Sequence, residues 1–154
     1  FTVIRHSNIY GPYDKFDLER SHVFGATMTK VMNTPEGGVI TVWGDGNEQR
    51  DLLFVDDLMR FVMRVIDRDG KSFEVYNAGL GESISVTRLV QKIIAASGKE
   101  LQIQFDRSQP TIPISFLIDS GKARDELAWK PEVALALGIE KTLAWYRKNI
   151  FYVA

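Results

Sequence analysis

The chain has 154 residues, of which 45% are apolar and 25% are charged, the balance of an ordinary globular domain. Its 19 Lys and Arg nearly cancel its 20 Asp and Glu, so no basic excess points to nucleic acid. It has no cysteine, which excludes disulfides, a thiolate metal site and a cysteine nucleophile in this chain. With no apolar run near the roughly 18 residues of a membrane span and no signal peptide, we expect a cytoplasmic protein without membrane partners.

Residues 1–5, FTVIR, begin with a nearly continuous apolar run. Such a run is typical of a strand that is buried on both faces of a parallel sheet. Because a sheet cannot begin with its central strand exposed and stay soluble, we expect this chain to be the C-terminal part of a longer protein.

A polar loop at residues 7–23 follows this strand and contains His22, one of the two histidines. Long irregular loops inside compact domains are usually functional or disordered. This loop ends at Ser21-His22, directly before a helical pattern. We therefore expect it to be ordered.

The next segments are predicted to be helix, strand, strand and helix. The first helix runs to about residue 33, and the strands are VITVW (39–43) and DLLFV (51–55), with turn residues between them. The expected N-caps are Ser21 for the first helix and Asp56 or Asp57 for the second. The expected apolar faces are Phe24, Met28, Val31 and Met32 on the first helix and Leu58, Phe61, Val62, Val65 and Ile66 on the second.

The second half of the chain continues the alternation. The expected elements are a strand at 73–79, a helix between a Ser85 cap and Gly98, a half-buried strand at 101–105, and helices at about 120–127 and 132–148. Strands that alternate with helices favour an α/β fold.

Glycines after the strand at 73–79 raise the question of a dinucleotide site. Gly79-Leu80-Gly81 stands between a strand and a helix, as in the G-x-G-x-x-G fingerprint, but position 84 is Ile84. A plain strand-to-helix turn is the better interpretation. No G-x-x-x-x-G-K-[ST] motif is present.

Three segments carry longer motifs: IRHSNIYGPYDKF followed by SHV; VITVWGDGNEQRDLLFVDD; and the ending IDSGKARDELAWKPEVALALGIEKTLAWYRKN. Together they resemble the extended short-chain dehydrogenase/reductases, the NAD-dependent epimerase/dehydratase family that acts on nucleotide sugars. The resemblance covers essentially the whole chain. Within that family, YGPYDKF followed by SHV is most similar to the GDP-L-fucose synthases.

The resemblance implies that residues 1–154 are the C-terminal, substrate-binding part of an extended Rossmann-type (doubly wound) fold, with the last strands of its parallel sheet. The family's glycine-rich NAD(P) loop and Tyr-x-x-x-Lys pair would lie upstream, and no Tyr-x-x-x-Lys occurs here. We therefore expect NAD or NADP in the full-length parent, and not on this chain alone. Family members often dimerise through upstream helices, so a homodimeric parent is consistent with the resemblance.

Asn8 and Arg50 are candidate substrate-binding residues. The Asn8 amide has a donor and an acceptor suited to sugar hydroxyls, and the resemblance implies that it faces the substrate. The alternative is a turn asparagine that bonds its own backbone. The Arg50 guanidinium can hold a diphosphate by two parallel hydrogen bonds, and the family uses it there. The alternative is an exposed arginine paired with Asp51 or Glu48.

Lys30 and Trp43 complete the expected substrate-binding set. Lys30 matches a basic position that meets the diphosphate in the fucose synthases, and two helical turns place it on the same helix face as His22. Trp43 either stacks on the base or packs against the protein.

His22 is the candidate catalytic residue. A histidine changes charge near neutral pH and can move protons. The resemblance implies an acid or base in epimerisation, partnered by a cysteine upstream of this chain. The alternative is a structural histidine at a helix terminus.

One segment departs from the family pattern. Family members commonly carry an arginine or lysine shortly before the strand that here reads FLID, and this sequence has Ile112-Pro113-Ile114-Ser115 in that place. One phosphate or sugar contact is therefore expected to be missing, which weighs against exact GDP-L-fucose synthase activity.

Three functions follow from these observations. In the first, the parent is an NAD(P)-dependent enzyme that interconverts a nucleotide sugar through a keto intermediate. The 7–23 loop is then a wall of the sugar pocket. The isolated chain is expected to be inactive. The second is a non-catalytic module of the same fold that binds a nucleotide sugar or a partner. The third is a subunit that works only in a complex.

Overall fold

The computed structural model describes residues 1–68, 72–109, 111 and 117–151. The strands are β1 (Thr2–His6), β2 (Asn8–Tyr10), β3 (Val39–Trp43), β4 (Gln49–Phe54), β5 (Glu74–Ala78), β6 (Ser83–Ser85) and β7 (Gln102–Asp106). The helices are α1 (Val23–Asn33), α2 (Val55–Ile66), α3 (Val86–Ser97), α4 (Gly121–Leu127) and α5 (Leu135–Tyr146), followed by the π-helical turn η1 (Arg147–Phe151). Within these ranges no helix is both long and apolar enough to cross a membrane. The α/β prediction is confirmed.

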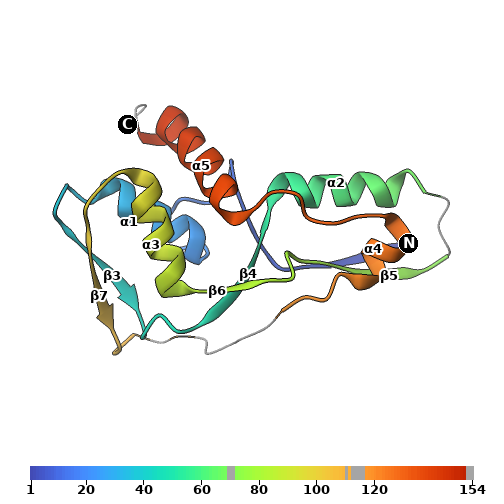
Figure 1. Ribbon diagram of the computed structural model, residues 1–154, viewed down its shortest axis with the longest axis horizontal. Helices are drawn as coiled ribbons and strands as arrows, with labels where there is room; N and C mark the ends of the chain where they lie inside the picture. The colour runs from blue at the N-terminus through green and yellow to red at the C-terminus, as the bar shows by residue number, and fades with distance from the viewer. Residues whose placement is uncertain (69–71, 110, 112–116, 152–154) are drawn as a thin grey trace.

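The strands pair in three small groups, mostly in parallel. β1 pairs with β5, β2 with β4 and β3 with β7, all parallel, whereas β6 runs antiparallel to β4. Parallel pairs need crossover connections, and here these connections contain helices. Figure 1 shows β1 and β5 lying beside α2 and α4, and β3 and β7 lying below α1 and α3.

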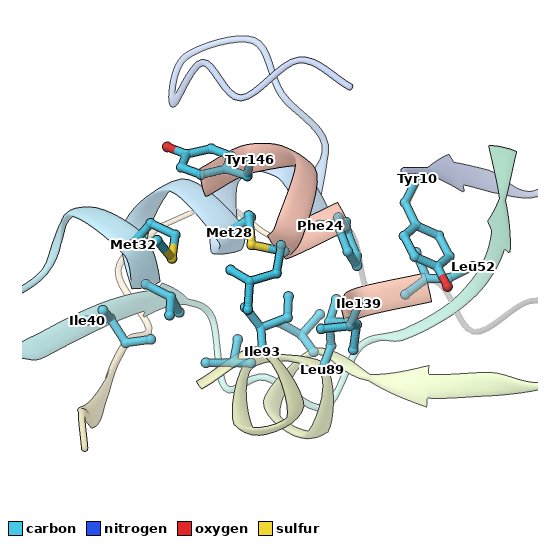
Figure 2. Close-up of a cluster of buried hydrophobic side chains, with 14 of the residues drawn as sticks. Tyr10, Phe24, Met28, Met32, Ile40, Leu52, Leu89, Ile93, Ile139 and Tyr146 are labelled. Atoms are coloured by element: carbon cyan, nitrogen blue, oxygen red, sulfur yellow. The ribbon is translucent and has the colours of Figure 1, made fainter. Parts of the chain in front are cut away.

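Strand β4 joins two hydrophobic cores. Leu52 and Phe54 belong to the core of α1, α3 and α5, whereas Leu53 belongs to a second core with α2 and α4. This division arises because successive side chains of a strand point to opposite faces. Figure 2 shows the first core, where labelled side chains from α1, α3, α5 and β3 converge. Residues of β4 are therefore held rigidly between the two cores.

Strand β1 is less buried than its sequence predicts. Thr2, Val3 and Ile4 are half-buried, and Arg5 and His6 are exposed. In the described part of the chain its pairing is with β5 alone. One edge of an apolar strand is therefore open.

The N-cap predicted for α1 is wrong. The helix begins at Val23 with His22 in the N-cap position, and no side chain caps it. Ser21 lies one residue further out, and its Oγ is buried without a hydrogen-bond partner in the described chain. The predicted apolar face is confirmed, because Phe24, Met28, Val31 and Met32 are all buried.

The N-cap predicted for α2 is also wrong. Phe54 occupies that position because β4 runs directly into the helix, and Asp56 and Asp57 fall in the first turn. The buried Asp57 carboxylate accepts hydrogen bonds from the backbone N–H groups of Glu132 (2.8 Å) and Val133 (3.1 Å). Asp57 therefore fixes the segment before α5 against the start of α2.

The remaining helices agree more closely with the sequence. The Ser85 Oγ accepts a hydrogen bond from the Arg88 N–H, and Gly98 ends α3 in the left-handed conformation, as predicted. On α2, Phe61 is fully buried but Ile66 is 67% exposed, so the predicted stripe is partly wrong. Helix α5 begins later than the predicted residue 132.

Candidate functional site

A cavity of about 450 Å³ lies between α1, β3, β4 and the start of α3. Its volume falls in the range of small-molecule sites, roughly 300–1,000 Å³. Lys30, Trp43 and Arg50 all line it, each from a different element. Its apolar wall includes Val42 and Val86. The structure thus brings together three of the five residues that the sequence singles out.

Lys30 is fixed at the wall of this cavity. Its Nζ donates a hydrogen bond to the Thr41 carbonyl at 2.8 Å and lies 5.9 Å from the centre of the Trp43 ring. Partial burial lowers the pKa of the Lys30 ammonium below its usual value. The Trp43 side chain is 54% exposed, so much of its surface remains available to a ligand. The two residues form a cationic and aromatic corner.

Arg50 lies in β4, where its main chain is opposite Ile84 of β6. Its Nη1 donates to the Gln49 carbonyl at 2.8 Å, and the residue is only half-buried. The sequence left open a surface pair with Asp51. The Asp51 carboxylate is fully buried and is instead used by backbone N–H groups. The Arg50 guanidinium thus bonds to the Gln49 carbonyl, and the Asp51 carboxylate to the N–H groups of Leu80 and Gly81.

The Gly79-Leu80-Gly81 turn is occupied by the chain's own carboxylate. The N–H groups of Leu80 and Gly81 donate to Asp51 at 2.8 and 3.2 Å. Phosphate loops bind through free backbone N–H groups of this kind. This turn does not fit the pyrophosphate of a dinucleotide. It leads from β5 into the short strand β6, not directly into a helix as the sequence predicts.

Two glycines shape the turn between β3 and β4. Gly44 and Gly46 have φ values of +77° and +74°, a region that favours glycine. A Cβ on Gly44 would lie 2.7 Å from Oε1 of Glu48, and one on Gly46 would lie 2.2 Å from Oγ1 of Thr87. The turn can therefore close tightly only with glycine at both positions.

Glu48 and Ser21 line the cavity but were not predicted as ligands. Oε2 of Glu48 and Oγ of Ser21 are buried and have no hydrogen-bond partner among the residues that the structure describes. Nothing in their spacing distinguishes them from an exposed turn residue and a helix cap. Only the fold places both on the wall of this cavity.

His22 lies in a different hollow. This second hollow, of about 440 Å³, is lined by the 9–15 segment, Arg20, His22 and Val55. The histidine is exposed, and its carbonyl accepts the Ala26 N–H at 3.0 Å. His22 and Lys30 therefore do not share a cavity, although they belong to the same helical segment.

Asp14 is the acidic neighbour of His22 in this second hollow. Its Oδ2 is buried and unpartnered within the described ranges. Burial raises the pKa of the Asp14 carboxyl, although the Lys15 N–H on Oδ1 and the nearby His22 both act to lower it. The second hollow thus combines an imidazole with a partly desolvated carboxyl.

Asn8 lines neither of these two cavities. Its Nδ2 donates to the Asp51 carbonyl at 3.1 Å, which differs from the local turn bond that the sequence left open. Asn8 therefore helps to fix β2 beside β4, and its amide oxygen takes no part in that bond.

A third hollow, of about 1130 Å³, lies between α3 and residues 131–136. It contains Arg88 and Lys92 but none of the residues that the motifs single out. The cavity of about 450 Å³ is the better candidate because two cations and an aromatic ring converge there.

The departure from the family pattern at Ile112-Pro113-Ile114-Ser115 lies outside the described residues. Within the described ranges, no group of three or more His, Asp or Glu side chains is arranged to hold a metal ion.

Comparison with known proteins gives consistent matches. The model of the NAD dependent epimerase/dehydratase family matches residues 1–79. GDP-L-fucose synthase 1 of Arabidopsis thaliana is 34% identical over 146 residues, which is 94% of this chain and 45% of that protein. The chain therefore spans less than half the length of this relative.

Two solved structures have the same fold. UDP-glucose 4-epimerase of Thermotoga maritima, solved with UDP-glucose, is 26% identical with a TM-score of 0.85 and aligns with 97% of this chain and 46% of its own. The dTDP-glucose 4,6-dehydratase of Bacillus anthracis, solved with NAD, is 27% identical with a TM-score of 0.79 and aligns with 98% of this chain and 46% of its own. The Rossmann-type fold prediction is confirmed.

Proposed function

Because this chain belongs to the NAD dependent epimerase/dehydratase family, we propose that it is the substrate-binding part of an NAD(P)-dependent nucleotide-sugar epimerase, reductase or dehydratase. The related proteins include a synthase, an epimerase, a dehydratase and the dTDP-4-dehydro-6-deoxy-D-allose reductase of a Streptomyces species. Residues 1–154 would supply the sugar-nucleotide site, and the remaining part of the protein would supply the cofactor site.

The convergence of Lys30, Trp43 and Arg50 on one cavity carries this proposal. A nucleotide sugar contains a diphosphate, a flat base and two sugar rings. Ammonium and guanidinium groups are the usual protein partners of phosphate oxygens. The exposed Trp43 ring offers a stacking surface for a base or sugar. The two cations therefore match the diphosphate of such a ligand, and the aromatic ring matches one of its rings.

Two further observations support the division between substrate and cofactor sites. The turn at Gly79–Gly81 is filled by Asp51, so the dinucleotide would bind elsewhere in the full-length protein. The open edge of β1 would accept a further parallel strand. When bound, the cofactor would supply hydride transfer at the sugar carbon.

His22 would act at the sugar end of the ligand. Its hollow adjoins the cavity through the neighbouring residue, Ser21, which lines the cavity itself. An imidazole is a common general acid or base in enzymes. We assign to it the acid or base role in epimerisation, and to the Asn8 amide oxygen a contact with a sugar hydroxyl.

Calorimetric titration of the full-length protein with GDP-sugars, UDP-sugars and dTDP-sugars tests this proposal. We expect one class to bind, and the double variant Lys30→Ala, Arg50→Ala to bind it far more weakly. Lys92→Ala, in the hollow beside α3, removes a matched charge and should leave affinity unchanged. No binding of any nucleotide sugar would refute the proposal. Binding without turnover would favour the non-catalytic module.

A further inference from the structure

Glu48 lines the cavity that contains Lys30 and Arg50. Its Oε2 is buried, yet no donor in the described part of the chain bonds to it. A buried polar atom without a partner costs free energy, and a charged one costs more. A ligand that brings a donor to this oxygen would remove that cost.

The local backbone fixes this carboxylate near the end of β3. The Glu48 carbonyl accepts the Val86 N–H at 3.0 Å, which anchors the turn to the start of α3. Oε1 of Glu48 lies close to Gly44. A Cβ added to Gly44 would be only 2.7 Å from this oxygen. The carboxylate is therefore folded back beside Gly44, the residue directly after Trp43.

The charge of this carboxylate indicates which part of a ligand it can face. A diphosphate is anionic and is repelled by a nearby carboxylate, so the phosphates belong with Lys30 and Arg50. The carboxylate needs a part of the ligand that carries donors. Two adjacent oxygens suit two adjacent donors, as in other bidentate carboxylate pairs.

A nucleotide has two such donor pairs. Guanine presents N1–H and N2–H side by side, and the ribose of any nucleotide presents its 2′- and 3′-hydroxyls. Uracil and thymine instead present a single N3–H between two carbonyl oxygens, which a carboxylate repels.

We propose that Glu48 is a specificity-determining residue of this cavity, where its carboxylate accepts a pair of adjacent donors from the nucleotide part of the ligand. The source of the pair is either the guanine edge or the ribose diol. This inference rests on the proposed function, since it requires that the cavity binds a nucleotide.

Titrations of the full-length protein with GDP, IDP, 2′-deoxy-GDP and UDP test the proposal. IDP lacks only the N2 amino group of GDP, and 2′-deoxy-GDP lacks only one ribose hydroxyl. The test variant is Glu48→Gln, which keeps the shape and one acceptor oxygen. The control is Glu19→Gln, which makes the same change at an exposed residue of the same cavity. Thermal unfolding checks that both variants fold.

The two variants should differ in their effect on nucleotide affinity. Removing a negative charge near a diphosphate by itself strengthens binding, so Glu19→Gln should bind equally or more tightly. Glu48→Gln should weaken binding by about tenfold or more, because a charge-assisted pair is lost. If guanine supplies the donors, Glu48→Gln should weaken the binding of GDP and 2′-deoxy-GDP. It should weaken the binding of IDP and UDP much less. If the ribose supplies the donors, Glu48→Gln should weaken the binding of GDP, IDP and UDP but not the binding of 2′-deoxy-GDP.

Either of these patterns supports the proposal. Unchanged or tighter binding of all four nucleotides by Glu48→Gln overturns it. If Arg50→Ala still weakens all four in that case, the proposed function stands and only the role of Glu48 is lost. If the parent protein binds none of the four, this inference falls, and the titration with nucleotide sugars decides the proposed function separately.

Discussion

The carboxylate of Asp51 accepts a hydrogen bond from the backbone N–H of Leu80, with 2.8 Å between Oδ1 and the nitrogen. Its Oδ2 accepts from Gly81 at 3.2 Å and from Ile118 at 3.3 Å. One buried side chain in β4 therefore holds the turn after β5 and the segment before α4.

Asp51→Asn should destabilise the protein strongly. The new amide places N–H donors where the carboxylate accepted backbone donors, so buried groups lose their partners. We expect the free energy of unfolding to fall by about 3 kcal/mol, measured by urea denaturation. Asp67→Asn, at an exposed position after α2, is the control and should change it by less than about 0.5 kcal/mol. Equal stability of the two variants would contradict this role.

Arg50→Ala in the full-length protein should weaken nucleotide-sugar binding. The loss of a charge-assisted, bidentate contact costs roughly 1.5–3 kcal/mol of binding free energy. Arg50→Lys should recover only part of this, because an ammonium cannot form two parallel bonds. Calorimetry measures the affinity of both variants. Unchanged affinity of the alanine variant would show that Arg50 does not contact the substrate.

The affinity for the nucleotide sugar should fall at alkaline pH because of Lys30. Burial lowers the pKa of its ammonium, so the charge disappears at a lower pH than for an exposed lysine. Since the diphosphate needs the charged form, affinity should fall as pH rises through this lowered pKa. Lys30→Arg keeps its charge and should bind with little change over the same range. Parallel pH profiles of the two proteins would argue against a contact between Lys30 and phosphate.

His22→Gln should separate two activities of the full-length protein. Epimerisation should fall by roughly 10²–10⁴-fold if His22 moves the proton. Reduction of an already epimerised keto sugar should suffer much less, because residues outside this chain carry that step. Solvent deuterium incorporation at the sugar carbon is the direct measurement. Exchange at the parent rate would show that His22 is only a helix-terminal residue.

The 154-residue chain alone should not bind NADPH with useful affinity. The N–H groups of its Gly79–Gly81 turn already bind Asp51. Calorimetric titration, with circular dichroism to show that the chain is folded, measures this. Tight binding would mean that a dinucleotide site exists within these residues.

Features that depend on neighbours in the sequence were predictable. The apolar face of α1, the Ser85 cap and the Gly98 terminus all follow from spacing within a few turns of helix. The Gly44 turn likewise follows from its glycines, because φ near +77° is a local demand.

Features that depend on distant partners were not predictable. Asp57 has the sequence signature of a helix cap, but its carboxylate bonds to Glu132 and Val133, some 75 residues away. Ser21 loses the cap position because the backbone becomes helical only at Val23. The role of Glu48 depends on burial, which its position in a polar turn conceals.

Ser21 and His22 are consecutive residues, yet they line different hollows. Consecutive Cα atoms lie about 3.8 Å apart and are joined by a rigid peptide plane. A displacement of the backbone at Ser21 would therefore also displace the backbone of His22. A ligand that moves Ser21 in the first cavity would in this way shift a residue of the second hollow.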